Sequence, residues 1–204
     1  EDSIMQARVN EYATVKLTCD LSKLSVKEKQ LVAALIDIAA IMDDLYWKQT
    51  LGDKQAFLDS IKNENEKKFA MINYGPWDRL DDNKPFMAAY GEKPLGANFY
   101  PKDITKEEFE KFDNKDKTGL YTLIRRNEDK SLKVVWYHDE YKEELQKASD
   151  LLKKAAGLAE DDGLKKYLEL RAEALITSNY QPSDMAWMDM KNNRIDFVVG
   201  PIEN

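Results

Sequence analysis

The sequence has very few of the side chains that hold transition metals. It contains one cysteine, Cys19, and one histidine, His138. No His/Cys set with the ligand number and spacing of a zinc site can therefore be assembled. A carboxylate-only site for a hard cation stays open, but no loop has the spacing of such a site. We therefore expect no metal or other cofactor in this chain.

The single cysteine also excludes an intrachain disulfide framework. The 204 residues are enough to bury a core without one. Cys19 stands next to Asp20 and not beside a cationic residue that would favour its thiolate, so we interpret it as a small apolar filler. His138 is followed by Asp139. We interpret it as a surface or structural residue, because a catalytic histidine needs convergent partners.

Long hydrophobic runs and basic runs are missing as well. The longest apolar stretch, LVAALIDIAAIM at 31–42, contains Asp37 and is shorter than the roughly 20 residues that a membrane helix needs. It predicts a buried helix and no membrane span. With a net charge of -7 and no long basic run, nucleic acid is not an expected partner. Neither a Gly-rich phosphate loop nor a Gly-x-Ser-x-Gly elbow is present.

What the sequence has in quantity is charge and helical pattern, with 34% charged and 43% hydrophobic residues. Ser25, with Glu28 three residues later, forms the capping-box pattern. Apolar residues then recur at helical spacing, which predicts a long and nearly buried helix. A second helix over about 53–70 has a sparse apolar stripe and is expected at the surface. Thr105 with Glu108 forms another capping box and predicts a short helix.

The second half mixes strand and helix signals. Two β-rich runs, GLYTLIRR and LKVVWYH, are joined by NEDKS, which predicts a hairpin within 118–137. Helices over about 139–159 and 163–178 should form a helical hairpin. The end, RIDFVVGPIEN, predicts a strand over 194–199. The fold class expected is α+β, mostly helical, with a small sheet that contains the hairpin and the terminal strand.

Two loops rich in aromatic residues stand apart from this helical pattern. NYGPWDRL at 73–80 and PLGANFYPKD at 94–103 combine Pro, Gly and Asn with large rings, as fixed irregular loops do. Trp77 and Trp187 both fall in Pro-flanked segments that we expect to be irregular. Such aromatic surface either fills the edge of a core or lines a ligand groove. Of these two alternatives we favour the core, because aromatic side chains bury large areas wherever they lie, and we keep the ligand groove as the other possibility.

These stretches carry a resemblance to a known family. NYGPWDRLDDNKPF, KPLGANFYPKDITKEEFE and the terminal RIDFVVGPIEN together resemble the N-terminal part of the dipeptidyl-peptidase III family of zinc metallopeptidases. The resemblance is strongest to the bacterial members and to the peptidase-like half of plant proteins that also carry a nudix domain. It covers about residue 70 to the end, and the first helix more loosely.

The resemblance implies a two-lobed enzyme that removes dipeptides from the N-termini of short peptides. In the family, a His-Glu-x-x-x-His helix and a downstream Glu hold the zinc, and they follow the GPIEN-like stretch. That motif is absent here. We therefore expect residues 1–204 to be the N-terminal part, without the zinc-binding helix. Its expected partners are the peptide substrate and the missing C-terminal lobe that carries zinc. The two aromatic loops are then scaffold that braces this part against the missing one.

The same resemblance names candidate site residues. It places Asp196 at an acidic position that helps to hold the free amine of the substrate, and Glu203 at the carboxylate of the terminal run. Family members have a tyrosine that assists at the scissile carbonyl. The position of this tyrosine corresponds to Val198 here, which puts the assisting role in doubt. From the residues alone, Asp196 is equally well interpreted as a strand-edge carboxylate that faces water. Successive side chains of a strand point to opposite faces, so Asp196 points away from the side of Phe197.

Two functions therefore remain open: the substrate-binding and scaffold part of a dipeptidyl-peptidase, or a non-catalytic peptide- or protein-binding module on the same scaffold. The chain begins at Glu1 without a methionine, so we expect that a preceding segment was removed. Its apolar end is typical of a chain that continues in a longer protein. The sequence leaves both the cell envelope and the cytoplasm open as its location.

Overall fold

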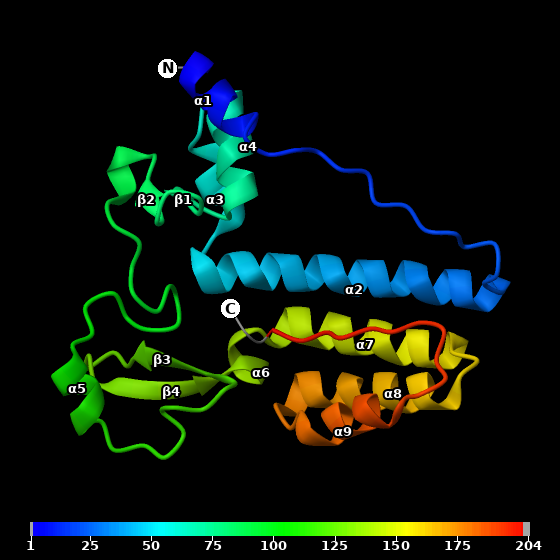
Figure 1. The fold of residues 1–204 in the computed structure, drawn as a ribbon. Helices are drawn as coiled ribbons and strands as arrows, with labels where there is room; N and C mark the ends of the chain where they lie inside the picture. The colour runs from blue at the N-terminus through cyan, green and yellow to red at the C-terminus, as the bar shows by residue number, and fades with distance from the viewer. Residues whose placement is uncertain (1, 202–204) are drawn as a thin grey trace. The chain divides into compact units, whose positions relative to one another are not determined.

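The computed structural model describes residues 2–201. The chain divides into two compact units. The first unit comprises the residues up to Thr18 together with Tyr46–Thr105, and the second comprises Cys19–Leu45 and everything from Lys106. Over the described residues helices predominate, and the strands form two small two-stranded sheets (Figure 1). The fold class is therefore α+β and mostly helical, as the sequence predicted.

The long helix predicted after Ser25 is α2, Val26–Thr50. Its capping box is formed: the backbone N–H of Glu28 donates to the Ser25 hydroxyl at 3.1 Å, and the N–H of Ser25 donates to the Glu28 carboxylate at 2.8 Å. The expectation of near-complete burial is wrong, because α2 has one buried face and Ile36 on the other is 64% exposed. No helix within residues 2–201 is long and apolar enough to cross a membrane.

The first unit surrounds a small aromatic core. Its elements are α1 (Asp2–Val9), α3 (Lys54–Asp59), α4 (Glu64–Asn73), the short strands β1 (Trp77–Asp78) and β2 (Lys84–Pro85), and the 3-10 helix η1 (Ala88–Tyr90). The α1 helix packs on α4, where Arg8 lies 5.8 Å over the ring of Phe69. One buried cluster gathers side chains from the end of α2, from α3 and its following turn, and from α4: Trp47, Phe57, Leu58, Ile61 and Ala70.

The single helix expected over about 53–70 is in fact two helices. The Ser60 hydroxyl donates to the Phe57 carbonyl at 2.6 Å, and the Asn63 side chain accepts from the Glu66 N–H at 2.9 Å. Asparagine is a strong N-cap residue, and its side chain competes with continuous helical bonding. Asn63 therefore starts α4 as a new helix, which the periodicity of the apolar residues did not reveal.

The GANFYP stretch forms a loop that caps the C-terminal end of α2. The backbone N–H of Asn98 donates to the Gln49 carbonyl at 2.9 Å, and its side-chain amide donates to the Lys48 carbonyl at 2.8 Å. Carbonyls in the last turn of a helix lack intrahelical partners, so these bonds satisfy them. Gly96 has a φ of +75°, a conformation that favours glycine.

Gly96→Ala is expected to destabilise the protein by about 1–2 kcal/mol, because a left-handed conformation costs that much for an L-residue. A Cβ there would also lie 2.6 Å from Cδ2 of Tyr100. The control is Gly157→Ala, where a Cβ meets nothing within 4 Å and alanine favours the helix. Urea unfolding followed by circular dichroism should give opposite signs for the two changes. Equal stability of Gly96→Ala and the unmodified protein would contradict this reading of the loop.

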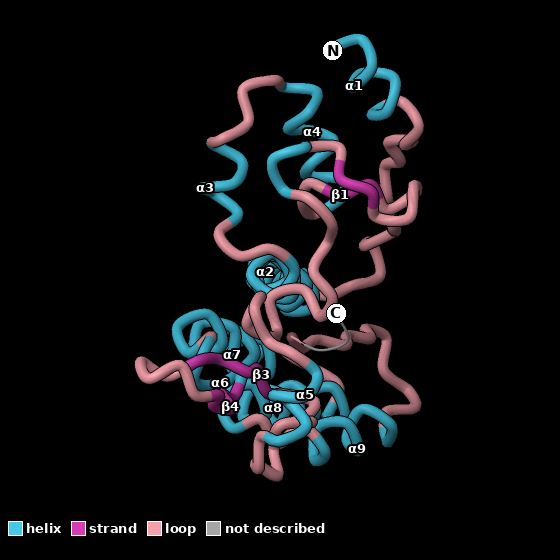
Figure 2. The backbone as a smooth tube through the Cα atoms, turned by 90° about the vertical axis from the view of Figure 1, so that its left-hand side faces the viewer, coloured by secondary structure: helices cyan, strands magenta, loops and turns pink. Residues whose placement is uncertain are grey.

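The second unit contains the predicted hairpin. Strands β3 (Thr122–Arg126) and β4 (Leu132–Trp136) pair antiparallel with Ile124 opposite Val134. The short helix α5 (Lys106–Lys111) precedes them, and Arg126 makes two hydrogen bonds to the Glu108 carboxylate, at 2.7 and 2.9 Å. Figure 2 shows β3 and β4 side by side, with α6 (Tyr137–Glu140) following directly.

Three further helices complete the second unit: α7 (Lys142–Leu158), α8 (Asp162–Thr177) and α9 (Gln181–Asp189). The α7 and α8 helices pack together as the predicted helical hairpin, and the Asp161 side chain caps α8 by accepting from the Leu164 N–H at 2.7 Å. The α9 helix packs in turn on α8. A charged pair, Arg171 with Asp184, joins α8 to α9 at 2.5 Å.

The terminal strand predicted over 194–199 does not form among the described residues. This stretch is an irregular segment without a partner strand (Figure 1). A strand exists only when a neighbour supplies its ladder of hydrogen bonds, and no strand in residues 2–201 lies beside it. Arg194 instead holds the segment to the start of α2, through the Lys23 carbonyl at 3.0 Å and the Glu28 carboxylate at 3.2 Å.

Candidate functional site

Asp196 lies in a hollow of about 290 Å³ between α9 and the terminal segment. The Trp187 indole Nε1–H donates to one of its carboxylate oxygens at 2.8 Å. Trp187 belongs to α9 and is 39% exposed, so the expectation of an irregular segment around it is wrong. The residues that line the hollow come from the end of α9 and the ten residues after it: Trp187, Met188, Met190, Lys191, Asn193 and Asp196.

The chemistry of this hollow is that of an oriented hydrogen-bond acceptor. An ionised carboxylate only accepts, and its two oxygens accept more bonds than the single indole supplies. The turn beneath it is fixed, because Lys191 donates to the Met188 carbonyl at 2.6 Å and Asn193 donates to the Ile195 carbonyl at 2.8 Å. Asp196 is thus positioned to accept a charge-assisted hydrogen bond from a bound cation.

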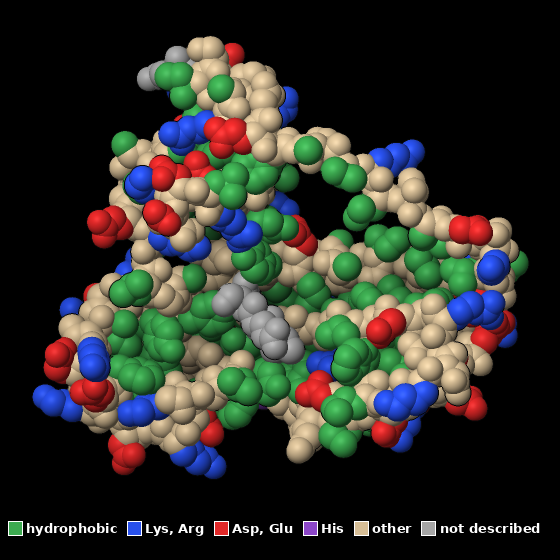
Figure 3. Space-filling model, viewed as in Figure 1, with side chains coloured by type: hydrophobic (Ala, Val, Ile, Leu, Met, Phe, Trp, Pro, Cys, Tyr) green, Lys and Arg blue, Asp and Glu red, His purple; other side chains and the backbone are tan. Residues whose placement is uncertain are grey.

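The residues around Asp196 alternate in exposure although no ladder is formed. Asp196 is exposed and Phe197 partly buried, and Val198 is 63% exposed while Val199 is 6% exposed. Val198 therefore shares the exposed side with Asp196 but has no polar group to offer a substrate. Figure 3 shows hydrophobic side chains at the surface over α9 and this segment. Glu203, the other candidate, lies outside the described residues.

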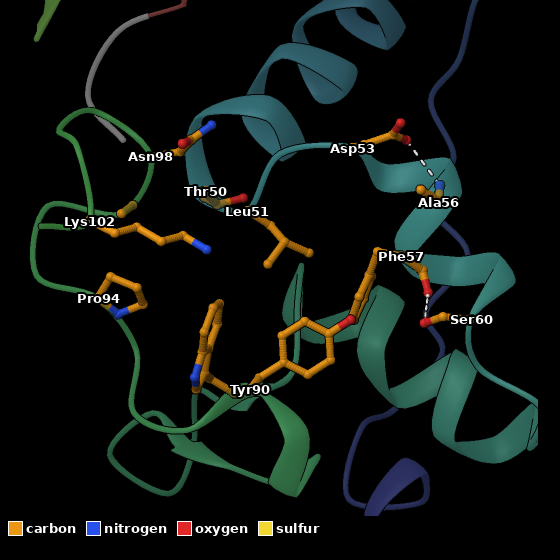
Figure 4. Close-up of a pocket in the computed structure, with 12 residues that line it drawn as sticks. Thr50, Leu51, Asp53, Ala56, Phe57, Ser60, Tyr90, Pro94, Asn98 and Lys102 are labelled. Carbon is orange, nitrogen blue, oxygen red and sulfur yellow. Dashed lines mark hydrogen bonds between the residues drawn. The ribbon is translucent and has the colours of Figure 1, made fainter. Parts of the chain in front are cut away.

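A second pocket, of about 340 Å³, lies wholly within the first unit (Figure 4). The sequence indicated its aromatic loops but not the cavity between them. Trp77 is 6% exposed, and its Nε1–H donates to the Gly91 carbonyl at 3.0 Å, so it is largely core, as expected. The lining comes from the end of α2, from α3 and from both loops: Thr50, Leu51, Asp53, Ala56, Phe57, Ser60, Trp77, Tyr90, Pro94, Ala97, Asn98 and Lys102.

His138 acquires a partner that the sequence did not suggest. Its Nδ1 lies 2.7 Å from the Ser178 hydroxyl, and its Nε2 lies 3.7 Å from the Asp139 carboxylate. The arrangement contains the residue types of a catalytic triad. However, 3.7 Å is beyond hydrogen-bonding distance, and Ser178 is 8% exposed at the end of α8. The geometry is that of a structural contact.

Cys19 is exposed, so its interpretation as an apolar filler is wrong. It lies in an irregular stretch between α1 and α2. Within residues 2–201, no group of three or more His, Cys, Asp or Glu side chains is placed to hold a metal ion. The side chains of residues 2–201 therefore do not fit a zinc site of the usual kind, which requires at least three protein ligands.

Both units have counterparts in proteins of known structure. The dipeptidyl-peptidase III (DPP III) of Caldithrix abyssi matches 92% of this chain with a TM-score of 0.87 and 36% sequence identity. The dipeptidyl-peptidase III of Corallococcus sp. strain EGB matches 93% with a TM-score of 0.86 and 32% identity. Nudix hydrolase 3 of Arabidopsis thaliana is 28% identical over 261 aligned residues, which include 98% of this chain. No protein-family model matches the sequence.

The resemblance to dipeptidyl-peptidase III that the sequence motifs predicted is confirmed in both sequence and fold. The match is to a part of each relative. This chain covers 38% of each of the two solved peptidase chains and 34% of the plant protein. It spans, in other words, between a third and two-fifths of their length.

Proposed function

We propose that this chain is the N-terminal, substrate-binding part of a zinc-dependent dipeptidyl-peptidase that removes N-terminal dipeptides from short peptides. The observation that carries the proposal is the match to two dipeptidyl-peptidase III structures over more than nine-tenths of the chain. The position of Asp196 supports it, because an oriented and exposed carboxylate in a partly apolar hollow suits a peptide with a free ammonium group.

In this proposal each candidate residue has a separate task. Asp196 accepts a hydrogen bond from the N-terminal ammonium of the peptide, and Glu203 contributes a second carboxylate. Val198 cannot polarise a carbonyl, so that task falls to another residue. The zinc, which activates water and polarises the scissile carbonyl in metallopeptidases, belongs to a C-terminal lobe outside these residues.

The gene sequence beyond the codon for Asn204 provides the first test. We expect a helix with the His-Glu-x-x-x-His motif to follow, with a further glutamate downstream of it. An open reading frame that stops or continues without these ligands would contradict the proposed peptidase role.

The 204-residue chain alone is expected to bind no stoichiometric zinc, since the ligands of a tetrahedral site are missing from its described residues. The measurement is metal content by mass spectrometry after purification without chelators, with a known zinc peptidase carried through the same procedure as the control. One tightly held zinc ion per chain would show that the ligands lie within this part after all.

A second function, a non-catalytic peptide-binding module on the same scaffold, is favoured by one observation. Val198 is exposed where the family resemblance places the assisting tyrosine. The two functions differ in the complete protein: both bind a free-amine peptide, but only the peptidase shortens it.

A further inference from the structure

We infer that the aromatic pocket of the first unit is a binding site for an apolar carboxylate, the chemistry of a peptide's C-terminal end. This site does not rest on the proposed peptidase function. Every residue that lines it belongs to the first unit, whereas Asp196 belongs to the second.

The apolar part of the ligand is selected by the pocket walls. Phe57 is 5% exposed, and Tyr90 contacts it edge-on with ring centroids 5.4 Å apart. In Figure 4, Leu51 and Pro94 face the same space. The Trp77 ring is held by its bond to the Gly91 carbonyl. Rings fixed by packing and hydrogen bonds lose little entropy when a ligand fills the space between them, so the pocket favours an aromatic or large aliphatic group.

The carboxylate is selected by Lys102. Its side chain extends across the pocket and its ammonium group points into the open space (Figure 4). Among residues 2–201, Lys102 makes neither a hydrogen bond nor an ion pair. The nearby acid in the lining, Asp53, is engaged as the cap of α3, where it accepts from the Ala56 N–H at 2.9 Å. An ammonium group with three donors beside an apolar slot complements a ligand with an apolar body and an anionic end.

The pocket is held in place by the hydrogen bonds between Asn98 and the end of α2. Asn98 lines the pocket and donates hydrogen bonds to two carbonyls at the end of α2. These bonds fix the loop that leads to Lys102. The site is therefore largely formed before a ligand arrives, and it needs no rearrangement of the backbone to bind one.

The test is titration of the 15N-labelled chain by NMR with N-acetyl-L-phenylalanine, and separately with its neutral amide. The acid should shift the Trp77 indole resonance, with a dissociation constant on the order of 1 mM for a ligand of this size. The amide should bind about fivefold more weakly, because it lacks the charge that Lys102 recognises. Added salt should weaken binding of the acid and leave that of the amide unchanged.

Two lysine variants make the test specific. Lys102→Met keeps the apolar stem, removes the ammonium, and should abolish the preference for the acid over the amide. Lys62→Met changes an exposed lysine outside the pocket and should leave the preference intact. An unshifted Trp77 resonance in the free variants shows that the pocket is still folded. Equal binding of acid and amide to the unmodified chain, a preference that survives Lys102→Met, or no shift of Trp77 would overturn the inference.

Discussion

In the complete protein, Asp196→Asn is expected to weaken the binding of free-amine peptides by about one to two powers of ten. A charge-assisted hydrogen bond to a desolvated ammonium is worth on the order of 1.5–3 kcal/mol, and 1.4 kcal/mol corresponds to roughly tenfold in affinity. The substitution is conservative in shape. Asparagine retains an oxygen that accepts from the Trp187 indole, so the hollow should keep its geometry and folding should hardly change.

The controls separate the ammonium contact from a general effect of charge. A peptide with a blocked N-terminus should bind equally poorly to both forms, since it has no ammonium to lose. Asp189→Asn, which removes another exposed carboxylate from α9, should leave the affinity of the free-amine peptide unchanged. Isothermal titration calorimetry gives all five affinities. If the free-amine peptide binds equally well to Asp196→Asn, Asp196 is only the water-facing carboxylate that the sequence also allowed.

The second large effect concerns the ion pair between α8 and α9. The Arg171 side chain is 2% exposed, and the Asp184 carboxylate, 2.5 Å away, is 50% exposed. The rings of Tyr167 and Tyr180 lie 5.4 and 5.0 Å from the guanidinium carbon. Burial raises the pKa of both phenols, although the Arg171 guanidinium lowers it, so neither tyrosine supplies a negative charge. Asp184 is therefore the counter-ion of a buried cation.

Asp184→Ala is expected to destabilise the protein by about 2–3 kcal/mol. Removing one partner from a buried pair costs about 3–5 kcal/mol, because the remaining charge stays buried and uncompensated. Asp184 is half exposed, so water at this position compensates part of the Arg171 charge after the substitution. The expected loss of stability therefore lies below the range for a fully buried pair. The measurement is chemical unfolding of the purified variant, with Asp189→Ala on the same helix as the matched control, expected to change stability by less than about 0.5 kcal/mol.

A double-mutant cycle isolates the pair itself. In an Arg171→Met background there is no buried charge to compensate, so Asp184→Ala should then cost less than about 1 kcal/mol. An equal cost in both backgrounds would show that Asp184 acts through the N-terminal turn of α9 and not through Arg171.

Features set by neighbouring residues were predictable from the sequence. The capping box at Ser25 depends on residues three positions apart, and the β3–β4 hairpin depends on two adjacent runs and their connection. Trp187 was misassigned for a local reason. Pro182 was taken as a sign of irregular structure, but it stands in the first turn of α9, where the missing N–H of proline costs no hydrogen bond.

Features set by distant residues were not predictable in this way. The hydrogen bond from Asn98 to the Lys48 carbonyl joins residues 50 positions apart, and neither stretch of sequence contains a pattern that predicts it. The terminal strand failed for a related reason. Its apolar alternation is real, since Val199 is buried and Val198 is exposed, but pairing depends on a neighbouring strand that residues 2–201 do not provide. The position of Asp196 beside Trp187 likewise depends on how α9 and the following turn pack.

The most direct test of the proposed function is to incubate the complete, zinc-loaded protein with a free-amine pentapeptide and to identify the products by mass spectrometry. We expect release of the dipeptide formed by the first two residues together with the remaining tripeptide, inhibition by a zinc chelator, and slower cleavage by Asp196→Asn. Release of the first residue as a free amino acid, or an intact peptide after prolonged incubation with the zinc-loaded protein, would contradict the proposed function.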